Sequence, residues 1–121
     1  MLHHEERSLN KKELMQQQEA LKWAVLFIQK YEKQPFEYLF EIPILEKTFE
    51  ELLNESWWKR PREFNITMGL GVALGQYMVD KLGFEWIIFK DKEGKDMAVK
   101  HQASGLISFP ISAVRKRLMT K

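Results

Sequence analysis

Residues 84–100 read FEWIIFKDKEGKDMAVK, and this stretch decides the fold class. Two runs rich in aromatic and β-branched residues, 84–90 and 95–100, flank a short polar loop that carries Gly94. Residues of these types favour extended backbone, and a glycine in a short loop allows two strands to turn back on each other. The stretch therefore predicts an antiparallel β-hairpin.

A third strand and a helix are predicted after the hairpin. Residues 106–109, Leu-Ile-Ser-Phe, follow a turn-like Gln-Ala-Ser-Gly segment, which favours a strand. Pro110 then opens a helix, because proline is well tolerated in the first helical turn. The inward face of this helix is expected to carry Ile111, Val114 and Leu118.

Three helices are predicted before the hairpin, from apolar residues that recur every three or four positions. Their ranges are 11–31, with Asn10 as the N-cap, then 44–53, then 65–82 or 67–82. Gly83 stands where the last of them ends, a position at which positive φ costs glycine little. Pro35 and Pro43 bracket residues 36–42, which are expected to form a turn or a short extended piece.

The chain of 121 residues is expected to form a single domain of the α+β class over residues 1–121. We expect three N-terminal helices, a three-stranded antiparallel sheet and a C-terminal helix, with the helices in a single layer on the sheet. Residues 1–10 are mostly polar, and we expect them to fray. With 45% hydrophobic residues, the chain has enough apolar side chains for one core.

The composition narrows the compartments and partners to consider. The chain has no cysteine, which excludes disulfides and Cys-ligated zinc and is compatible with a reducing compartment. Residues 1–7 are polar where a signal peptide needs an apolar run, and the longest apolar run, 24–28, is too short to span a bilayer. We therefore expect a cytoplasmic protein without a membrane partner.

The net charge is only +2, but the charges are unevenly distributed. Residues 1–55 hold eleven acidic residues against seven Lys and Arg, whereas residues 56–121 hold six against twelve. A basic half can attract nucleic acid or an acidic partner. The same charges can also be solvated faces that pair with each other across the fold.

Residue types and spacing indicate no catalytic or metal site. His3 and His4 are adjacent at a polar terminus and His101 stands alone, so no two histidines have the spacing of a metal site. The serines lack a nucleophile-elbow motif, although the fold could still bring one of them to His101. We predict no catalytic residue, no metal and no cofactor.

Residues 69–75, GLGVALG, superficially resemble a dinucleotide-binding fingerprint, but no strand precedes them and the spacing is one residue too long. Gly71 and Gly75 lie on one helical face, where they allow another element to pack close to the helix backbone. The alternative is a small-molecule pocket that these glycines open beside Glu85 and Trp86. For Glu85, solvent exposure on an edge strand is the other interpretation.

The strongest candidate for a partner-binding surface is a loop of aromatic and basic residues: Trp57, Trp58, Lys59, Arg60 and Arg62. Pro61 favours a loop here, because it disfavours helix in the residue before it. Tryptophans beside arginine are good contact anchors, since they bury a large area. Alternatively, one or both tryptophans are core residues that close the gap between two helices. One inward and one outward tryptophan is the compromise that we expect.

A second basic candidate is the triplet Arg115, Lys116 and Arg117 near the end of the last helix. These side chains could bind phosphate or carboxylate groups. Cations at a helix C-terminus also complement the helix dipole, and that explanation is sufficient by itself.

From residue 69 to residue 117, the order of features resembles the bacterial family known as domain of unknown function 3806. The resembling pieces are the glycine-spaced helix 71–75, the Leu-Gly-Phe-Glu-Trp segment 82–86, the turn 91–96 that leads into 97–99, and 109–112 ahead of 114–117. The resemblance implies a bacterial source and a compact α+β unit, and it brings no catalytic residue. Residues 1–61 lie outside it.

Three functions remain open at this point. The lack of a recognisable site and the aromatic-basic loop favour a non-catalytic bacterial protein-interaction domain that binds and neutralises a partner protein, as immunity proteins and antitoxins do. The first alternative is a small-molecule-binding or enzymatic domain that uses the pocket beside Trp86. The second is a nucleic-acid-binding domain that uses the basic half. The expected partner is another protein, and the sequence does not indicate an oligomeric state.

Overall fold

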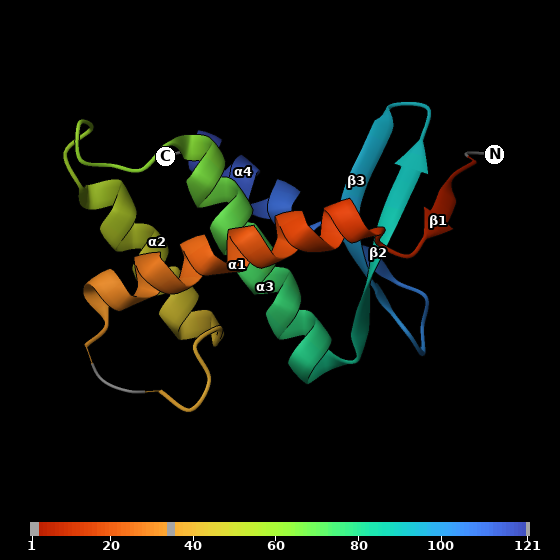
Figure 1. Ribbon diagram of the computed structural model, residues 1–121, viewed down its shortest axis with the longest axis horizontal. Coiled ribbons are helices and arrows are strands. Elements are labelled where there is room, and N and C mark those ends of the chain that lie inside the picture. The colour runs from red at the N-terminus through yellow and green to blue at the C-terminus, as the bar shows by residue number, and fades with distance from the viewer. Residues whose placement is uncertain (1–2, 34–35, 121) are drawn as a thin grey trace.

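The computed structural model describes residues 3–33 and 36–120, and within them the chain forms four helices and a four-stranded antiparallel sheet (Figure 1). In chain order the elements are β1 (Glu5–Arg7), α1 (Lys11–Tyr31), α2 (Ile42–Asn54), α3 (Glu63–Leu82), β2 (Phe84–Asp91), β3 (Gly94–His101), β4 (Ile107–Ser108) and α4 (Pro110–Met119). The predicted α+β class is confirmed, with one strand more than expected. Pro35, predicted to bracket an extended piece, lies outside the described residues.

The strands lie in the order β1-β2-β3-β4, and each neighbouring pair is antiparallel. The predicted hairpin is confirmed: Asp91 pairs with Gly94 around a two-residue loop, and Gly94 has a φ of 139° that favours glycine. The strand predicted for residues 106–109 is confirmed only over β4. Pro110 begins α4 directly after Phe109, so the strand cannot continue.

The expectation that residues 1–10 fray is wrong for residues 5–7, which form the strand β1. The first element of the fold is therefore a strand, and not the first of three helices as expected. β1 pairs with residues 88–90 of β2. Glu6 on β1 also accepts a hydrogen bond from the ammonium group of Lys100 on β3, at 2.7 Å. These contacts come from the distant end of the chain, and so the local sequence gives no sign of them.

Helix α1 begins as predicted, with Asn10 as its N-cap in a capping box. The Asn10 side chain accepts from the Glu13 N–H and the Glu13 carboxylate accepts from the Asn10 N–H, each at 2.9 Å. The same carboxylate accepts two hydrogen bonds from Arg7, at 2.7 and 2.9 Å, and lies 3.4 Å from Nζ of Lys95. The buried Glu13 therefore joins β1, α1 and β3.

The Glu13 contacts predict how stability depends on pH. The hydrogen bonds from Arg7, followed by those from the Asn10 N–H and Lys95, lower the pKa of Glu13 from 4.5 to about 2, against the opposing effect of burial. The folded state binds the carboxyl proton of Glu13 less tightly than the unfolded chain does. The stabilisation that the Glu13 hydrogen bonds provide is therefore fully present above pH 4.5. It is lost as the pH falls toward about 2.

Urea denaturation at a series of pH values should show this loss in the natural protein. The Glu13→Gln variant should lose less stability over the same acidic interval, because its side chain does not titrate. Equal pH slopes for the two proteins would contradict the role of Glu13.

Helices α2 and α3 each begin two residues earlier than the first residue predicted for them. Helix α2 starts at Ile42 because Pro43 occupies its first turn, where the missing N–H has no helical partner to lose. Helix α3 starts at Glu63 without a side-chain cap. It ends as predicted, with Gly83 in the left-handed conformation at φ 79°.

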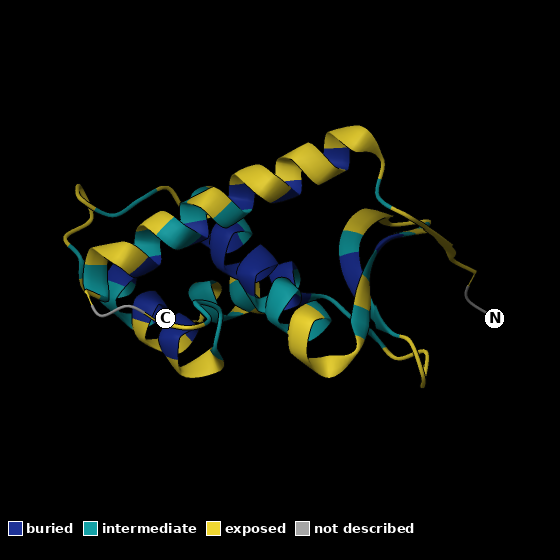
Figure 2. Cartoon of the chain, turned by 60° about the horizontal axis from the view of Figure 1, so that its bottom comes forward, coloured by how far each residue is buried: buried dark blue, intermediate teal, exposed yellow. Residues whose placement is uncertain are grey.

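The helices pack mainly on one another, so the expected single layer of helices on the sheet is wrong. Helix α3 lies between α1 and α4, and α2 packs on α1 and α3; among the described residues, α2 contacts no strand. The sheet joins one end of this helical bundle (Figure 1). Figure 2 shows that the helices turn their buried faces toward each other. The largest fully buried apolar side chains are Ile28, Leu52, Ile66, Val72 and Val99.

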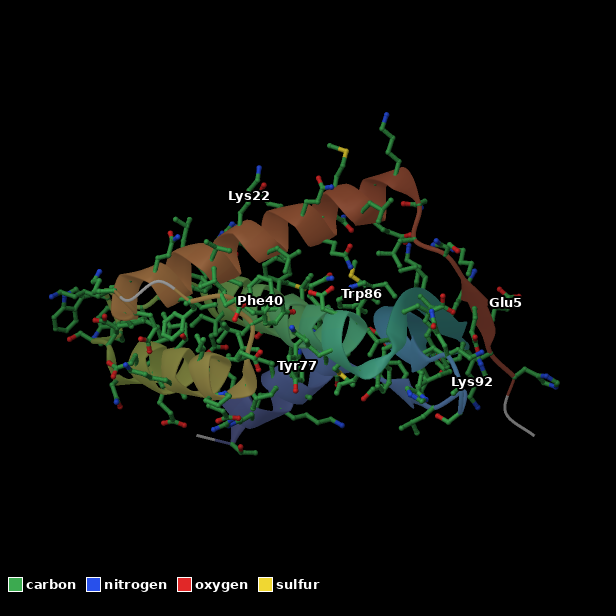
Figure 3. All side chains as sticks on the ribbon, turned by 90° about the horizontal axis from the view of Figure 1, so that it is seen from below. Glu5, Lys22, Phe40, Tyr77, Trp86 and Lys92 are labelled. Carbon is green, nitrogen blue, oxygen red and sulfur yellow. The ribbon has the colours of Figure 1, made fainter. Side chains whose placement is uncertain are left out.

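The glycine face of α3 packs closely against α4 and β2. A Cβ atom on Gly71 would lie 2.6 Å from Cα of Ile111 in α4. A Cβ atom on Gly75 would lie 2.2 Å from the indole ring of Trp86 in β2, which Figure 3 places beside α3. The predicted close approach of other elements to this helix is therefore confirmed.

Candidate functional site

The loop between α2 and α3 places both of its tryptophans on the surface. Trp57 is 80% exposed and Trp58 is 67% exposed. Their rings meet edge to face, with centroids 6.0 Å apart. The expectation of one inward and one outward tryptophan is wrong, because α1, α2 and α3 fill the core between them without either ring.

Hydrogen bonds within the loop fix the backbone that carries the two tryptophans. The N–H groups of Lys59 and Arg60 both donate to the carbonyl of Ser56, at 2.9 and 3.0 Å. The Arg60 guanidinium donates to the carbonyl of Leu53 at 2.7 Å, in the last turn of α2. Arg60 therefore supports the loop from within, while Lys59 and Arg62 are exposed.

The loop is also attached to α1 through Glu55. This carboxylate accepts a hydrogen bond from the Tyr31 hydroxyl at 2.8 Å and lies 2.9 Å from Nζ of Lys30. The contact with Lys30, then the one with Tyr31, lowers the pKa of Glu55. The aromatic pair is thus presented by a short, well-supported segment, which reduces the entropy lost when a partner binds.

Arg60→Ala is expected to lower the free energy of unfolding by about 1–2 kcal/mol, because the Leu53 carbonyl of α2 loses a charged donor. Arg62→Ala is the matched control and should change it by less than about 0.5 kcal/mol, since this side chain is exposed. Urea denaturation of both variants measures the difference. Equal effects would mean that the Arg60 hydrogen bonds do not hold the loop.

A further exposed aromatic residue, Phe64, was missed by the sequence reasoning. It lies in the first turn of α3, is 65% exposed and meets Trp23 of α1 edge to face at 6.3 Å. The available signal was its position outside the inward stripe of α3, which runs through Leu70 and Leu74.

The four residues of the predicted glycine pocket do not come together around a cavity. Ile111 and Trp86 occupy the space over Gly71 and Gly75. The indole N–H of Trp86 donates to the Gln76 side chain at 3.1 Å. Glu85, adjacent in β2, is exposed.

The basic triplet is divided between different surroundings. Arg117 donates to Glu46 at 2.6 Å and to Glu50 at 3.2 Å, both on α2, so it is committed to the contact between α2 and α4. Arg115 and Lys116 are exposed. The three residues therefore offer no combined basic surface for nucleic acid.

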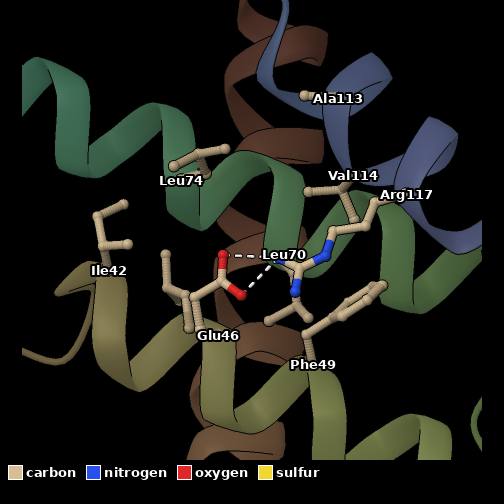
Figure 4. A pocket seen from close by; sticks show the side chains of 9 residues that line it. Ile42, Glu46, Phe49, Leu70, Leu74, Ala113, Val114 and Arg117 are labelled. Carbon is tan, nitrogen blue, oxygen red and sulfur yellow. Dashed lines mark hydrogen bonds and ion pairs between the residues drawn. The ribbon is translucent and has the colours of Figure 1, made fainter.

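A small cavity of about 240 Å³ lies between α2, α3 and α4 (Figure 4). Its walls are largely apolar, and Glu46 and Arg117 meet across it. Its size and lining suit a small apolar group. Sequence reasoning missed this cavity because its walls come from positions far apart in the chain. They are Ile42, Leu45, Phe49, Leu70, Leu74, Ala113 and Val114.

The single Ser–His contact within the described residues belongs to the turn after β3. Nδ1 of His101 lies 2.9 Å from the Ser104 hydroxyl and accepts the Ser104 N–H at 3.1 Å. The same hydroxyl accepts the N–H of Leu106 at 3.3 Å. These bonds close a turn on the surface.

Neither a cluster of metal ligands nor a membrane-spanning helix occurs within residues 3–33 and 36–120. No group of three or more His, Cys, Asp and Glu side chains gathers as metal ligands would. No helix in these ranges has the length and apolar character needed to cross a bilayer.

Residues 46–121 match the family described as "Domain of unknown function (DUF3806)", a range that begins well before residue 69 and includes the aromatic loop. No curated protein matches the chain. A solved structure from Bacteroides thetaiotaomicron VPI-5482 is similar, with a TM-score of 0.73 and 16% identity. The match covers 99% of this chain and 43% of that chain, and it shows a common fold.

Proposed function

This chain belongs to the DUF3806 family, and on that premise we propose that it is a non-catalytic protein-interaction domain. The observation that carries the proposal is the pair of exposed, edge-stacked tryptophans on a hydrogen-bonded loop. Large aromatic side chains on a supported backbone bury much area on binding and lose little conformational freedom. Solvent-exposed tryptophans of this kind contribute little to folding.

The surroundings of the tryptophans define the chemistry of the partner. Lys59 and Arg62 are exposed on either side of the hydrogen-bonded Arg60. The complementary surface therefore has an apolar hollow for the indole rings and acidic residues around it. In such an interface the aromatic residues supply most of the affinity, and the surrounding charges mainly set the association rate.

The proposal is tested by affinity purification from the native host with the natural protein and a Trp57→Ala/Trp58→Ala variant. The natural protein should recover one stoichiometric partner, and the variant should bind that purified partner about 100-fold more weakly or worse. Leu106→Ala is the control, because Leu106 is 63% exposed in a different turn. Undiminished binding by the double variant would overturn the proposal.

In its narrower form, the proposal is that the domain neutralises its partner in the cytoplasm of a bacterium, as an immunity protein or antitoxin does. The absence of cysteine and the resemblance to a bacterial family support this form. Expression of the recovered partner alone should then arrest growth, and co-expression of this chain should restore it. A partner that is harmless by itself contradicts the narrower form and leaves the interaction intact.

The cavity between α2, α3 and α4 favours a second candidate, the binding of a small apolar molecule. A ligand that binds the folded state raises the melting temperature by mass action. A thermal-shift screen of small apolar metabolites should detect it, and Leu74→Trp, which fills the cavity, should abolish the shift. No shift across the screen removes this candidate.

A further inference from the structure

The outer edge of β3 is covered by β4 along only part of its length. β4 pairs with residues 99–100, and the N–H of His101 donates to the carbonyl of Leu106 at 2.8 Å on the same side. Along an antiparallel strand, residues two apart direct their backbone groups to the same neighbour. Lys95 and Met97 therefore direct their N–H and C=O groups toward the side that β4 leaves open.

The chain itself does not fill this open edge. Pro110 lacks a backbone N–H and starts α4, so the chain does not continue along the β3 edge after Phe109. The close contact of Ile111 with Gly71 fixes the first turn of α4 against α3. A cleft of about 530 Å³ lies between the hairpin of β2 and β3 and the first half of α4, and it reaches α1 and α3 at Gln16 and Met68. This volume falls in the range of about 300–1,000 Å³ that is usual for ligand sites.

The cleft offers different chemistry on the two faces of the sheet. Met97 pairs with Ile88 on the face toward the helices, and it packs near Ile111. Asp96 alternates with Met97 and so lies on the opposite face, where it pairs with Phe89. One side of any added strand would therefore meet apolar side chains, and the other would meet the Asp96 carboxylate beside the rings of Phe89 and Phe109, whose centroids are 5.1 Å apart.

The charges that line the cleft are largely uncompensated. Asp91, Glu93 and Asp96 form no ion pair with any residue in the described ranges. Lys95 lies 3.4 Å from Glu13, but this carboxylate also pairs with Arg7 at 2.7 and 2.9 Å, so the charge of Lys95 is only partly compensated. On the strand side, three acidic residues therefore face the single cation Lys95, while Arg115 lines the α4 side. The strand side is negatively charged, which attracts a basic ligand.

We propose that this cleft binds an extended segment of another polypeptide, which adds an antiparallel strand beside β3. The backbone of the segment hydrogen-bonds to the backbone N–H and C=O groups of Lys95 and Met97. The segment runs in the same direction as β4. One residue of the segment places an apolar side chain against Met97 and Ile111. The next residue is basic and lies beside Asp96. The occupant is therefore a peptide in which apolar and basic residues alternate, and its site does not involve the tryptophan loop.

The test uses the whole chain, labelled with ¹⁵N, and an acetylated, amidated octapeptide in which valine and lysine alternate. Amide shifts should concentrate in residues 94–98 and 110–115. Methylation of the valine amides should weaken binding at least tenfold, because valine and Met97 lie on the same face and those amides point at β3. Methylation of the lysine amides should be tolerated, because they point away. A peptide of alternating valine and glutamate should bind at least tenfold more weakly than the lysine peptide.

Two variants check the charge on the strand side. Asp96→Lys should weaken binding of the lysine peptide at least tenfold, whereas Glu85→Lys, the same charge change at the other end of the hairpin, should leave it unchanged. Equal binding of the two methylated peptides, no shift at millimolar peptide, or shifts confined to residues 57–62 would overturn the proposal. Sedimentation that shows a dimer joined through the β3 edge would overturn it as well, in favour of a second copy of this chain.

Discussion

Leu52→Ala should lower the free energy of unfolding by about 3 kcal/mol. Leu52 has no exposed surface and lies in the cluster that joins α1, α2 and α3, with Ile28 and Ile66 among its members. Truncation removes buried methyl groups and leaves a cavity that the surrounding helices only partly close, at a typical cost of about 2–5 kcal/mol. Because α2 meets only other helices among the described residues, this site is central to its attachment.

Leu26→Ala is the matched control for Leu52→Ala. Leu26 also lies within a helix, but it is 63% exposed, so its truncation should change stability by less than about 0.5 kcal/mol. Urea denaturation of both variants gives the comparison, and equal unfolding slopes would show that both variants expose the same surface area on unfolding. A loss below about 1 kcal/mol at Leu52 would mean that α2 is not anchored as described.

Gly71→Ala should destabilise the protein by about 2 kcal/mol, although alanine is the better helix former by about 1 kcal/mol. The added Cβ would meet the backbone of Ile111 at 2.6 Å, and backbone cannot rotate away as a side chain can. Helix α4 would have to shift relative to α3. By the usual scaling, the melting temperature should fall by about 8 °C.

Gly69→Ala provides the control for Gly71→Ala within the same helix. It brings the same gain in helix propensity, but the nearest atoms to its Cβ would be 3.2 to 3.3 Å away, on Trp23, Ala24 and Phe27. The expected change is therefore close to zero or a small loss. If both variants behave alike in calorimetry, the close contact between α3 and α4 is not what requires Gly71.

The parts of the fold that the sequence predicted correctly are those that depend on neighbouring residues. Asn10 caps α1 through a residue three positions later, and Gly83 ends α3 through its own positive φ. The hairpin of β2 and β3 needs only its loop and two flanking runs. β1 was missed because it is a short strand whose three residues are all exposed, and because its pairing partner lies far away in sequence, at residues 88–90.

The sequence predicted which residues form the candidate site, but it did not predict what each of them does. The loop was identified from its tryptophans and arginines, which need no partner to be noticed. Arg60 supports the loop by donating to the carbonyl of Leu53. A sequence pattern does not show that these two groups lie close together. Likewise, Arg117 reads as part of a basic cluster until α2 brings Glu46 and Glu50 to it.

The short strand β1 has a consequence for folding order and for solubility. Arg7 pairs with Ile88, so this pairing encloses most of the chain and must await the hairpin, as contacts of high sequence separation generally do. With three exposed residues, β1 should also open more readily than the core, and the amides that it protects on β2 should exchange with solvent sooner. Each opening bares the edge of β2, which can then pair with another molecule. Residues 5–7 thus protect the folded protein from edge-to-edge aggregation.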